Sequence, residues 1–360
     1  MNFSPWVALQ HLGNQLKITK PRVRVSRKFR HRNTPPKHGP TITFLCPAIN
    51  VPLGGIKVLY KNSEYLTSMG VKSFIFHPEI SNFSCDWFKH SARIRSREPF
   101  DPREDFIVIP EVWACEFGKQ CKEQNIKYAI YVQNGYLISS ALDKIHSTND
   151  LQSVYENAAL VMSISDDTSM MIRLAFPQLD KRKIVRMLPH IGNHFSNGHK
   201  RRLITFMPRK LEEHSQKVCF YLKQNLPNDW QFSPIDGKSE MEVAELLSES
   251  SIFLSFCDQE GFGLPPLEAV LSGNIAIGYT GQGAKEYFER PLFRPVENGD
   301  FASFVEEVLI AISEIDSKSE SAIALKNVTN GLRLRYSIES EQEHLRDFSK
   351  RVSVLFAFQN

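Results

Sequence analysis

Two glutamates eight positions apart, Glu260 and Glu268, bracket the stretch EGFGLPPLE. The stretch follows the apolar run SIFLSF and holds two glycines and two adjacent prolines, which predicts a strand, a loop and a short helix ending before Gly273. We expect Glu260 in the loop and Glu268 in the first helical turn, so that both face the carboxyl edge of a sheet. The helix dipole alone would account for Glu268. It does not account for Glu260, or for a phenylalanine between two glycines.

Strand and helix patterns alternate along the chain from Thr41 onward. Such alternation predicts an α/β protein with parallel sheets and right-handed crossover helices. The length of 360 residues exceeds one hydrophobic core. A connection rich in proline, glycine and asparagine near Asn193 to Lys200 indicates the boundary. We therefore expect a basic arm over residues 1–40, a ligand-binding domain over each of 41–192 and 193–335, and a final helix within 336–360 that crosses back to the first domain or meets a partner.

Polar residues and glycines follow several predicted strands of the first domain. Gly54 and Gly55 come after the first strand, where backbone N–H groups can approach a phosphate. Glu111, Gln133 and Asn134 follow two later strands. Ligands of open α/β sheets bind beyond the carboxyl ends of the strands, so these residues are candidates for a site. Ordinary turn chemistry is the alternative explanation, above all where Asn134 precedes a glycine.

The longer stretch EGFGLPPLEAVLSGN resembles the E-x7-E signature of the retaining glycosyltransferases with the GT-B fold, in particular family 4. The resemblance extends from about Thr41 to the end of the chain. It implies two Rossmann-like domains that face each other across a cleft, the first on the acceptor side and the second holding the donor. It also implies transfer of a hexosyl or deoxyhexosyl group, with retention of configuration, from a nucleotide-sugar donor to a glycan, polysaccharide or glycolipid acceptor. The nucleotide sugar is then a substrate, and no cofactor is expected.

The same resemblance implies roles for single residues. Glu268 would hold the ribose hydroxyls of the donor, and Glu260 would face the donor sugar and its anomeric carbon. Arg209 and Lys210 would neutralise the leaving diphosphate; the family spacing, with the lysine about five positions after the arginine, is not kept, so Lys217 is an alternative. The backbone that would approach the sugar or the diphosphate belongs to Gly54, Gly55, Gly261, Phe262, Gly263 and Leu264.

Many members of that family have a histidine at the end of a first-domain strand, where this chain has Gln133 and Asn134. A neutral amide cannot act as a general base, so we expect hydrogen bonds to sugar or acceptor from these two residues and from Glu111. His77 and His190 end other strands, and we expect structural roles for both.

The basic residues are concentrated at the start of the chain. Eleven lysines and arginines precede Glu64, the first acidic residue, and nine of them lie between Lys17 and Lys37. We expect this arm to contact anionic membrane lipid or to be a solvated extension. Apart from the single Phe29, no aromatic residue stands among these charges, so we expect no nucleic-acid partner. Apolar runs too short to cross a bilayer and the lack of a signal-peptide pattern predict a cytoplasmic protein, peripheral to the inner face of a membrane.

Metal binding is not expected from the sequence. It has no D-x-D pattern in a strand-loop context, and Asp166 with Asp167 is explained by helix capping. The six cysteines are scattered, which predicts buried thiols. Two other classes of function stay open: another sugar-nucleotide enzyme on the same scaffold, an epimerase or a phosphorylase, and a non-catalytic binding module attached through its basic arm.

Overall fold

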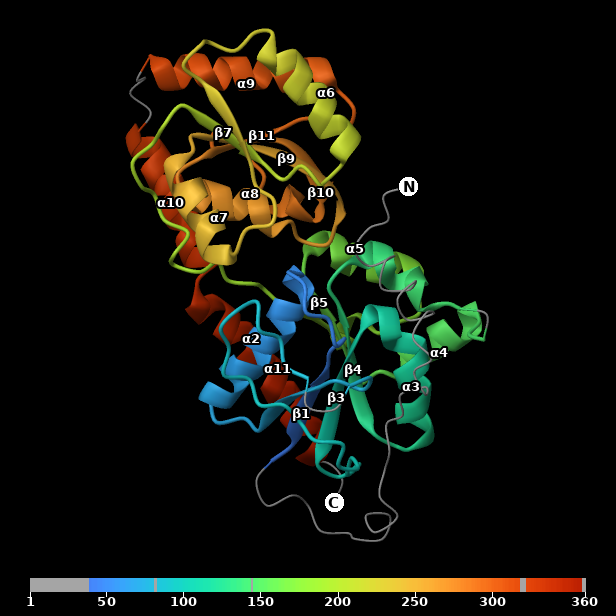
Figure 1. Cartoon of the computed structure of the whole chain (residues 1–360). Coiled ribbons are helices and arrows are strands. Elements are labelled where there is room, and N and C mark those ends of the chain that lie inside the picture. The colour runs from blue at the N-terminus through green and yellow to red at the C-terminus, as the bar shows by residue number, and fades with distance from the viewer. Residues whose placement is uncertain (1–38, 81–82, 144, 318–321, 358–360) are drawn as a thin grey trace.

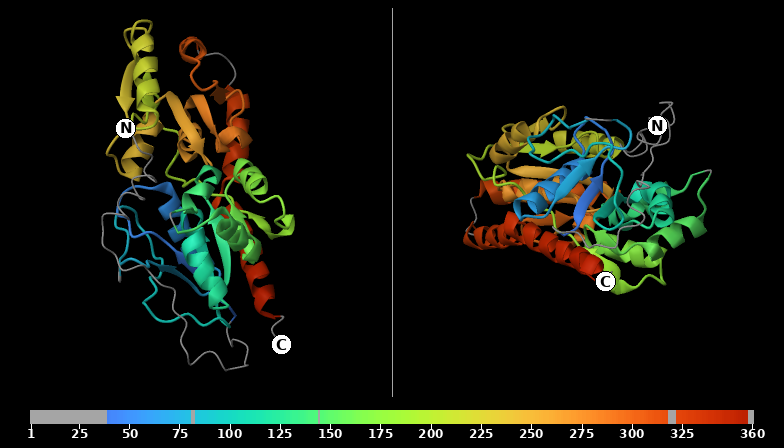
Figure 2. Two further views of the ribbon diagram at one scale, coloured as in Figure 1. Left: turned by 90° about the vertical axis from the view of Figure 1, so that its right-hand side faces the viewer. Right: turned by 90° about the horizontal axis from the view of Figure 1, so that it is seen from below.

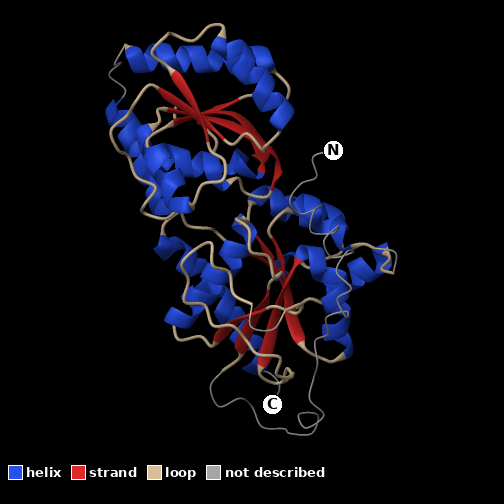
Figure 3. Cartoon of the chain, viewed as in Figure 1, coloured by secondary structure: helices blue, strands red, loops and turns tan. Residues whose placement is uncertain are grey.

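The computed structural model describes residues 39–80, 83–143, 145–317 and 322–357, so the predicted basic arm lies almost wholly outside the described residues. The described chain forms two α/β domains, one above the other in Figure 1. In each domain, helices cover both faces of a parallel sheet (Figure 3). Such sheets are buried on both sides, which explains why the strand sequences read as nearly continuous apolar runs.

The N-terminal domain contains a six-stranded parallel sheet with the order β2-β1-β3-β4-β5-β6. The chain leaves β1 for β2 and then returns to β3 on the other side of β1, so the order reverses between β1 and β3. The strands are β1 (Thr41–Leu45), β2 (Ser73–Phe76), β3 (Asp105–Pro110), β4 (Lys127–Val132), β5 (Leu160–Ser163) and β6 (Ile184–Arg186). The helices are α2 (Gly54–Ser68), η2 (Glu111–Trp113), α3 (Ala114–Glu123), η3 (Gly135–Ala141), α4 (Thr148–Asn157), α5 (Asp166–Ala175) and η4 (Lys181–Lys183).

The C-terminal domain contains a five-stranded parallel sheet with the order β11-β10-β9-β7-β8. Here the order reverses between β7 and β9. The strands are β7 (Leu203–Phe206), β8 (Gln231–Pro234), β9 (Ile252–Glu260), β10 (Ile275–Gln282) and β11 (Phe293–Pro295). The helices that follow or connect them are α6 (Glu212–Lys223), α7 (Glu240–Glu249), α8 (Leu264–Leu271), η5 (Gly283–Glu286), α9 (Phe301–Asp316) and α10 (Ala322–Arg335).

The last helix, α11 (Ile338–Ala357), packs on the N-terminal domain although it ends the chain. Its apolar face contacts α2, and Phe348 meets the Phe106 ring of β3 at 6.0 Å between centroids. Figure 2 shows this helix running down from the upper domain along the lower one. The chain crosses between the domains near Ile191 and again near Tyr336. These two segments are hydrogen-bonded to each other: the Ile191 N–H donates to the Tyr336 carbonyl at 3.0 Å.

Two details of the EGFGLPPLE stretch differ from the sequence-based prediction. Glu260 does not lie in a loop: β9 continues to it because Gln282 of β10 pairs with it. Glu268 is not in the first turn of α8, because the helix already begins at Leu264, directly after Gly263 with φ +80°. Glu268 is therefore the fifth helical residue, and capping of the helix dipole no longer explains it.

Candidate active site

The order reversal of each sheet marks where a ligand crevice is expected in an α/β fold. In the C-terminal domain, β7 leads to Lys210 and β9 ends at Glu260. In the N-terminal domain, β1 leads to Gly54 and β3 leads to Glu111. The two reversal points therefore supply most of the predicted site residues. The contacts that these residues make with one another could not be predicted from the sequence.

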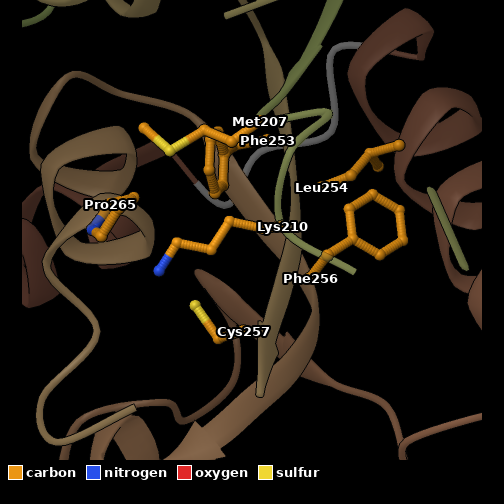
Figure 4. Close-up of a pocket in the computed structure, with 7 residues that line it drawn as sticks. All are labelled: Met207, Lys210, Phe253, Leu254, Phe256, Cys257 and Pro265. Atoms are coloured by element: carbon orange, nitrogen blue, oxygen red, sulfur yellow. The ribbon is translucent and has the colours of Figure 1, made fainter. Parts of the chain in front are cut away.

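Lys210 and Glu260 form a direct ion pair between their ammonium and carboxylate groups. Leu211, the next residue, adopts the left-handed conformation (φ 43°, ψ 58°) at the start of α6, which turns the chain directly after Lys210. Figure 4 shows Lys210 beside Cys257 and Pro265, around a cavity of about 10 Å³. That volume is about enough for one water molecule.

The other basic candidates pair with carboxylates other than Glu260. Arg209 pairs with Asp236 at 2.8 Å, and its side chain is 78% exposed. Lys217 pairs with Glu213 on the exposed face of α6, at 2.5 Å. Of the two lysines considered from the sequence, Lys210 is the one that contacts Glu260.

Glu268 is half-buried in α8, and among the described residues no group donates a hydrogen bond to its carboxylate. Burial raises the pKa of Glu268 to about 7; the nearby charge of Lys57 opposes this shift and that of Glu240 adds to it. Lys57, in the first turn of α2, pairs with Glu240 of α7 at 2.5 Å, and Glu240 also contacts His194 at 2.8 Å. An N-terminal-domain lysine thus lies across the domain gap, near Glu268.

These cross-domain partners were missed by the sequence analysis. Lys57 stands just after Gly54 and Gly55, which is the one local signal that could have drawn attention to it. Nothing local marks Glu240 or His194, because their partners are far away along the chain.

The loop from Gly261 to Leu264 fits between the two domains. A Cβ atom on Gly261 would lie 1.9 Å from the Gln133 carbonyl oxygen. The backbone of the N-terminal domain at Gln133 and Asn134 therefore occupies the space where a side chain at position 261 would lie. The sequence predicts a ligand at this place. Gly263 requires its positive φ and accepts a hydrogen bond from the Tyr287 hydroxyl. Phe262 is buried against Tyr336, and a Cβ atom added to Gly54 would lie 3.6 Å from the Leu264 Cδ1.

Gln133 and Asn134 contact this region from the N-terminal side. Gln133 Nε2 donates to the Gly55 carbonyl at 3.1 Å, and Asn134 Nδ2 donates across the gap to the Gln259 carbonyl at 2.8 Å. Glu111 is only 1% exposed and accepts from Asn134 N–H at 3.0 Å. Burial raises the pKa of Glu111 to about 7. In this structure Glu111 thus holds the loop that carries Asn134 and does not face the gap.

His77 and His190 both have protein partners. His77 is buried between the Tyr60 hydroxyl (2.7 Å) and the Cys46 carbonyl (2.8 Å), and burial lowers its pKa to about 4. His190 contacts Glu341 of α11 and the Tyr65 hydroxyl. These contacts agree with structural roles for both histidines.

Three further observations concern the described part of the chain. All six cysteines are free and buried, as predicted. No group of three or more His, Cys, Asp or Glu side chains there is arranged to hold a metal ion. None of its helices has the length and apolar character needed to span a bilayer.

Comparison with known proteins gives one curated relative and many similar structures. No family model matches the chain. It is 29% identical over 177 residues to an alpha-1,6-glucosyltransferase of Actinobacillus pleuropneumoniae serotype 7, and this covers 47% of the chain and 51% of that protein. The chain thus matches about half the length of this curated relative.

The solved structures agree over most of the chain. Sucrose-phosphate synthase from Thermosynechococcus elongatus superposes with a TM-score of 0.64 at 14% identity, over 88% of this chain and 99% of that one. Anabaena HepE, in complex with UDP and glucose, superposes with a TM-score of 0.63 at 12% identity, over 86% of this chain and 99% of that one. The fold is of the GT-B type. The catalytic domain of Arabidopsis thaliana starch synthase IV, bound to ADP and acarbose, superposes with a TM-score of 0.57 at 11% identity, over 88% of this chain and 100% of that one. At such identities the likeness establishes the GT-B fold alone.

Proposed function

We propose that the protein is a retaining glycosyltransferase that moves a hexosyl or deoxyhexosyl group from a nucleotide-sugar donor to a glycan, polysaccharide or glycolipid acceptor. One observation carries the proposal: the half-buried Glu268 carboxylate, without a protein donor among the described residues, lies on α8, the helix that directly follows the end of β9 where Glu260 pairs with Lys210. An acceptor-only group of this kind suits the two hydroxyls of a ribose.

The charges at the site suit the two ends of a breaking glycosidic bond. Transfer builds negative charge on the departing diphosphate and positive charge on the anomeric carbon. In the proposed mechanism Lys210 and Arg209 stabilise the diphosphate, and Glu260 stabilises the anomeric centre or holds sugar hydroxyls. The first-turn amides of α2, at Gly54 and Gly55, lack intrahelical partners and suit an anion. Lys57 adds a positive charge at the same helix end.

The relatives narrow the donors to be tested first. The curated relative is described as a glucosyltransferase, and two of the structural neighbours hold UDP with glucose or ADP with acarbose. UDP-glucose and ADP-glucose are therefore the first donors to test, with neutral glycans as acceptors. Peripheral contact with anionic membrane through residues 1–40 remains a separate prediction, outside the described residues.

Replacing Glu268 by alanine is expected to weaken nucleotide binding. Hydrogen bonds to a charged group contribute about 1.5–3 kcal/mol, so the dissociation constant should rise about tenfold or more. Calorimetric titration of the native chain and the variant with UDP, ADP and GDP checks this. The exposed Glu245→Ala change on α7 is the control. Equal binding by the Glu268 variant and the native chain would contradict the donor site.

The pH dependence of binding provides a second measurement at Glu268. Its pKa is raised to about 7, so the carboxyl is neutral in much of the population below that pH. Because the ionised form is the better acceptor for ribose hydroxyls, nucleotide affinity should rise as the pH increases through 7. Glu268→Gln should remove this rise, while a rise that persists in the variant would have to come from another group.

Metal independence is a further prediction. The proposed mechanism neutralises the diphosphate with Lys210 and Arg209, so transfer from the donor should be unchanged, within twofold, by excess EDTA. Initial rates measured with and without EDTA, followed by added Mg²⁺ or Mn²⁺, check it. A loss of activity in EDTA that Mg²⁺ restores would show that a divalent cation supplies charge to the donor.

A further inference from the structure

A second and larger cavity lies beside the Lys210–Glu260 pair, at the same edge of the C-terminal sheet. Its volume is about 230 Å³, and its polar lining consists of Asp258, Thr280, Gln282, Lys285, Glu297 and Asn298. We call it the β10 pocket. Cys257 lines the β10 pocket and also the small cavity next to Lys210, so the pocket and the cavity share this residue as a common wall. A molecule in the β10 pocket would be next to the proposed reaction centre.

A β-bulge forms this pocket. Thr280 of β10 pairs with Cys257, and Gln282 pairs with Glu260, so that Asp258 and Gln259 together face Gly281. Bulges re-aim side chains and are frequent beside active sites. A Cβ atom on Gly281 would lie 2.8 Å from the Cys257 Cβ, so the glycine lets the two strands meet here.

Two residues at the bulge have strained backbones. Gln259 has φ 47° and Gln282 has φ 72°, a region that residues with side chains seldom occupy. Such conformations persist only where the surroundings hold them, and they are concentrated at ligand sites. Both strained residues lie next to Glu260, one before it in β9 and one paired with it across the sheet.

The pocket also lies close to the N-terminal domain. Asp166 N–H donates to Glu286 at 3.0 Å, which joins η5 to the start of α5, and Arg186 at the end of β6 pairs with Glu286 at 2.7 Å. Figure 1 shows the ends of β9 and β10 directed toward α5. The lining residues themselves belong to the C-terminal domain, so an acceptor in the pocket would lie beside this contact between the domains.

Asp167 and Tyr136 of the N-terminal domain extend this polar environment. The Tyr136 hydroxyl donates to one oxygen of Asp167 at 3.3 Å, and the other oxygen is buried without a hydrogen-bond partner among the described residues. Burial raises the pKa of Asp167, and the charge of Lys285 opposes the shift. Burial together with Asp167 and Asp258 raises the pKa of Tyr136 to about 12. Tyr136 and Asp167 are thus in direct contact with each other, and both are under the influence of charged residues that line the pocket.

The lining indicates the class of ligand. Two carboxylates, two amides and a hydroxyl offer acceptors and donors for hydroxyl groups, and they outnumber the single lysine. Two negative charges against one positive charge disfavour a diphosphate. The volume is below the about 300–1,000 Å³ of pockets for larger ligands, so it suits a single sugar unit better than a whole nucleotide sugar.

We propose that the β10 pocket binds a neutral, hydroxyl-rich sugar unit of the acceptor. This proposal rests on the proposed glycosyltransferase function and adds where the acceptor lies. It assigns Asp258, Glu297 and Asn298 to acceptor binding and leaves the donor to Glu268, Lys210 and the first turn of α2.

Saturation-transfer NMR on the full chain tests this assignment. The probes are UDP or ADP together with glucose, galactose, mannose and N-acetylglucosamine at millimolar concentration. The Asn298→Trp change places an indole in the pocket from an exposed position, so we expect the sugar signal to fall at least tenfold and the nucleotide signal to stay. Lys223→Trp, on the exposed face of α6, is the matched control and should keep both signals. Glu297→Gln is a milder second variant and should weaken sugar binding severalfold.

The outcomes separate the two proposals. Sugar binding that is the same in the native, Asn298→Trp and Glu297→Gln chains would overturn the assignment of the pocket. So would a native chain that binds a nucleotide but none of the four sugars. A native chain that binds neither nucleotide would instead contradict the donor site, and with it the function on which the pocket proposal rests.

Discussion

Replacing Lys210 by methionine is expected to reduce glycosyl transfer by about 10²–10³-fold. Removing one preorganised group that stabilises charge in the transition state typically costs this much in rate. Lys210 is placed for that role because it lies at the reversal point of the sheet and already pairs with Glu260. In the proposed mechanism a bound diphosphate would be a stronger partner for the ammonium and would release Glu260 toward the sugar. The measurement is the initial rate of nucleoside diphosphate release with UDP-glucose or ADP-glucose and an acceptor.

Other lysines on the following helix make this test specific. Lys223→Met on the exposed face of α6 is the control and should keep the native rate. Thermal unfolding of all variants shows whether the fold is intact. A loss at Lys217→Met in place of Lys210→Met would assign the diphosphate to Lys217, the alternative that the sequence left open. Native activity in Lys210→Met would remove the lysine from the mechanism.

Replacing Gly261 by alanine is expected to lower kcat by about 100-fold while each domain stays folded. The added Cβ would lie 1.9 Å from the Gln133 carbonyl oxygen and 2.9 Å from the Asn134 Cα. Both are backbone atoms, so no side-chain rotation relieves the clash, and the two domains must move apart there. A displacement of about 1 Å at a reacting centre can cost about 10²-fold in rate.

Kinetics together with small-angle X-ray scattering check this prediction. The variant should have a larger radius of gyration than the native chain in the presence of the nucleotide. Gly331→Ala in α10 is a matched control, because nothing lies within 4 Å of the added Cβ atom. If Gly261→Ala retained native turnover, the contact between Gly261 and Gln133 would not belong to the reacting arrangement.

Local sequence patterns were sufficient for most of the secondary structure. The alternation of strands and helices expected from Thr41 onward is present, and the apolar run SIFLSF lies in β9 of a parallel sheet. The strand, loop and helix around EGFGLPPLE were also expected, because strand length, proline at a helix start and glycine after a helix end act within a few residues. Two details there differ. The extension of β9 to Glu260 arises because pairing with Gln282 of β10 overrides local loop signals, and α8 begins at Leu264, directly after Gly263, which leaves Glu268 beyond its first turn.

The sequence by itself thus determined the α/β class, the two-domain order and the position of Glu260 and Glu268 on one strand-loop-helix unit. Only the tertiary structure decided which lysine contacts Glu260, that Gly261 meets the backbone at Gln133, and that Lys57 lies across the gap beside Glu240. The physical reason is distance along the chain. A turn or a helix end depends on neighbouring residues, whereas these contacts join residues separated by 50 to 183 positions and form only when the two sheets are packed and the domains meet.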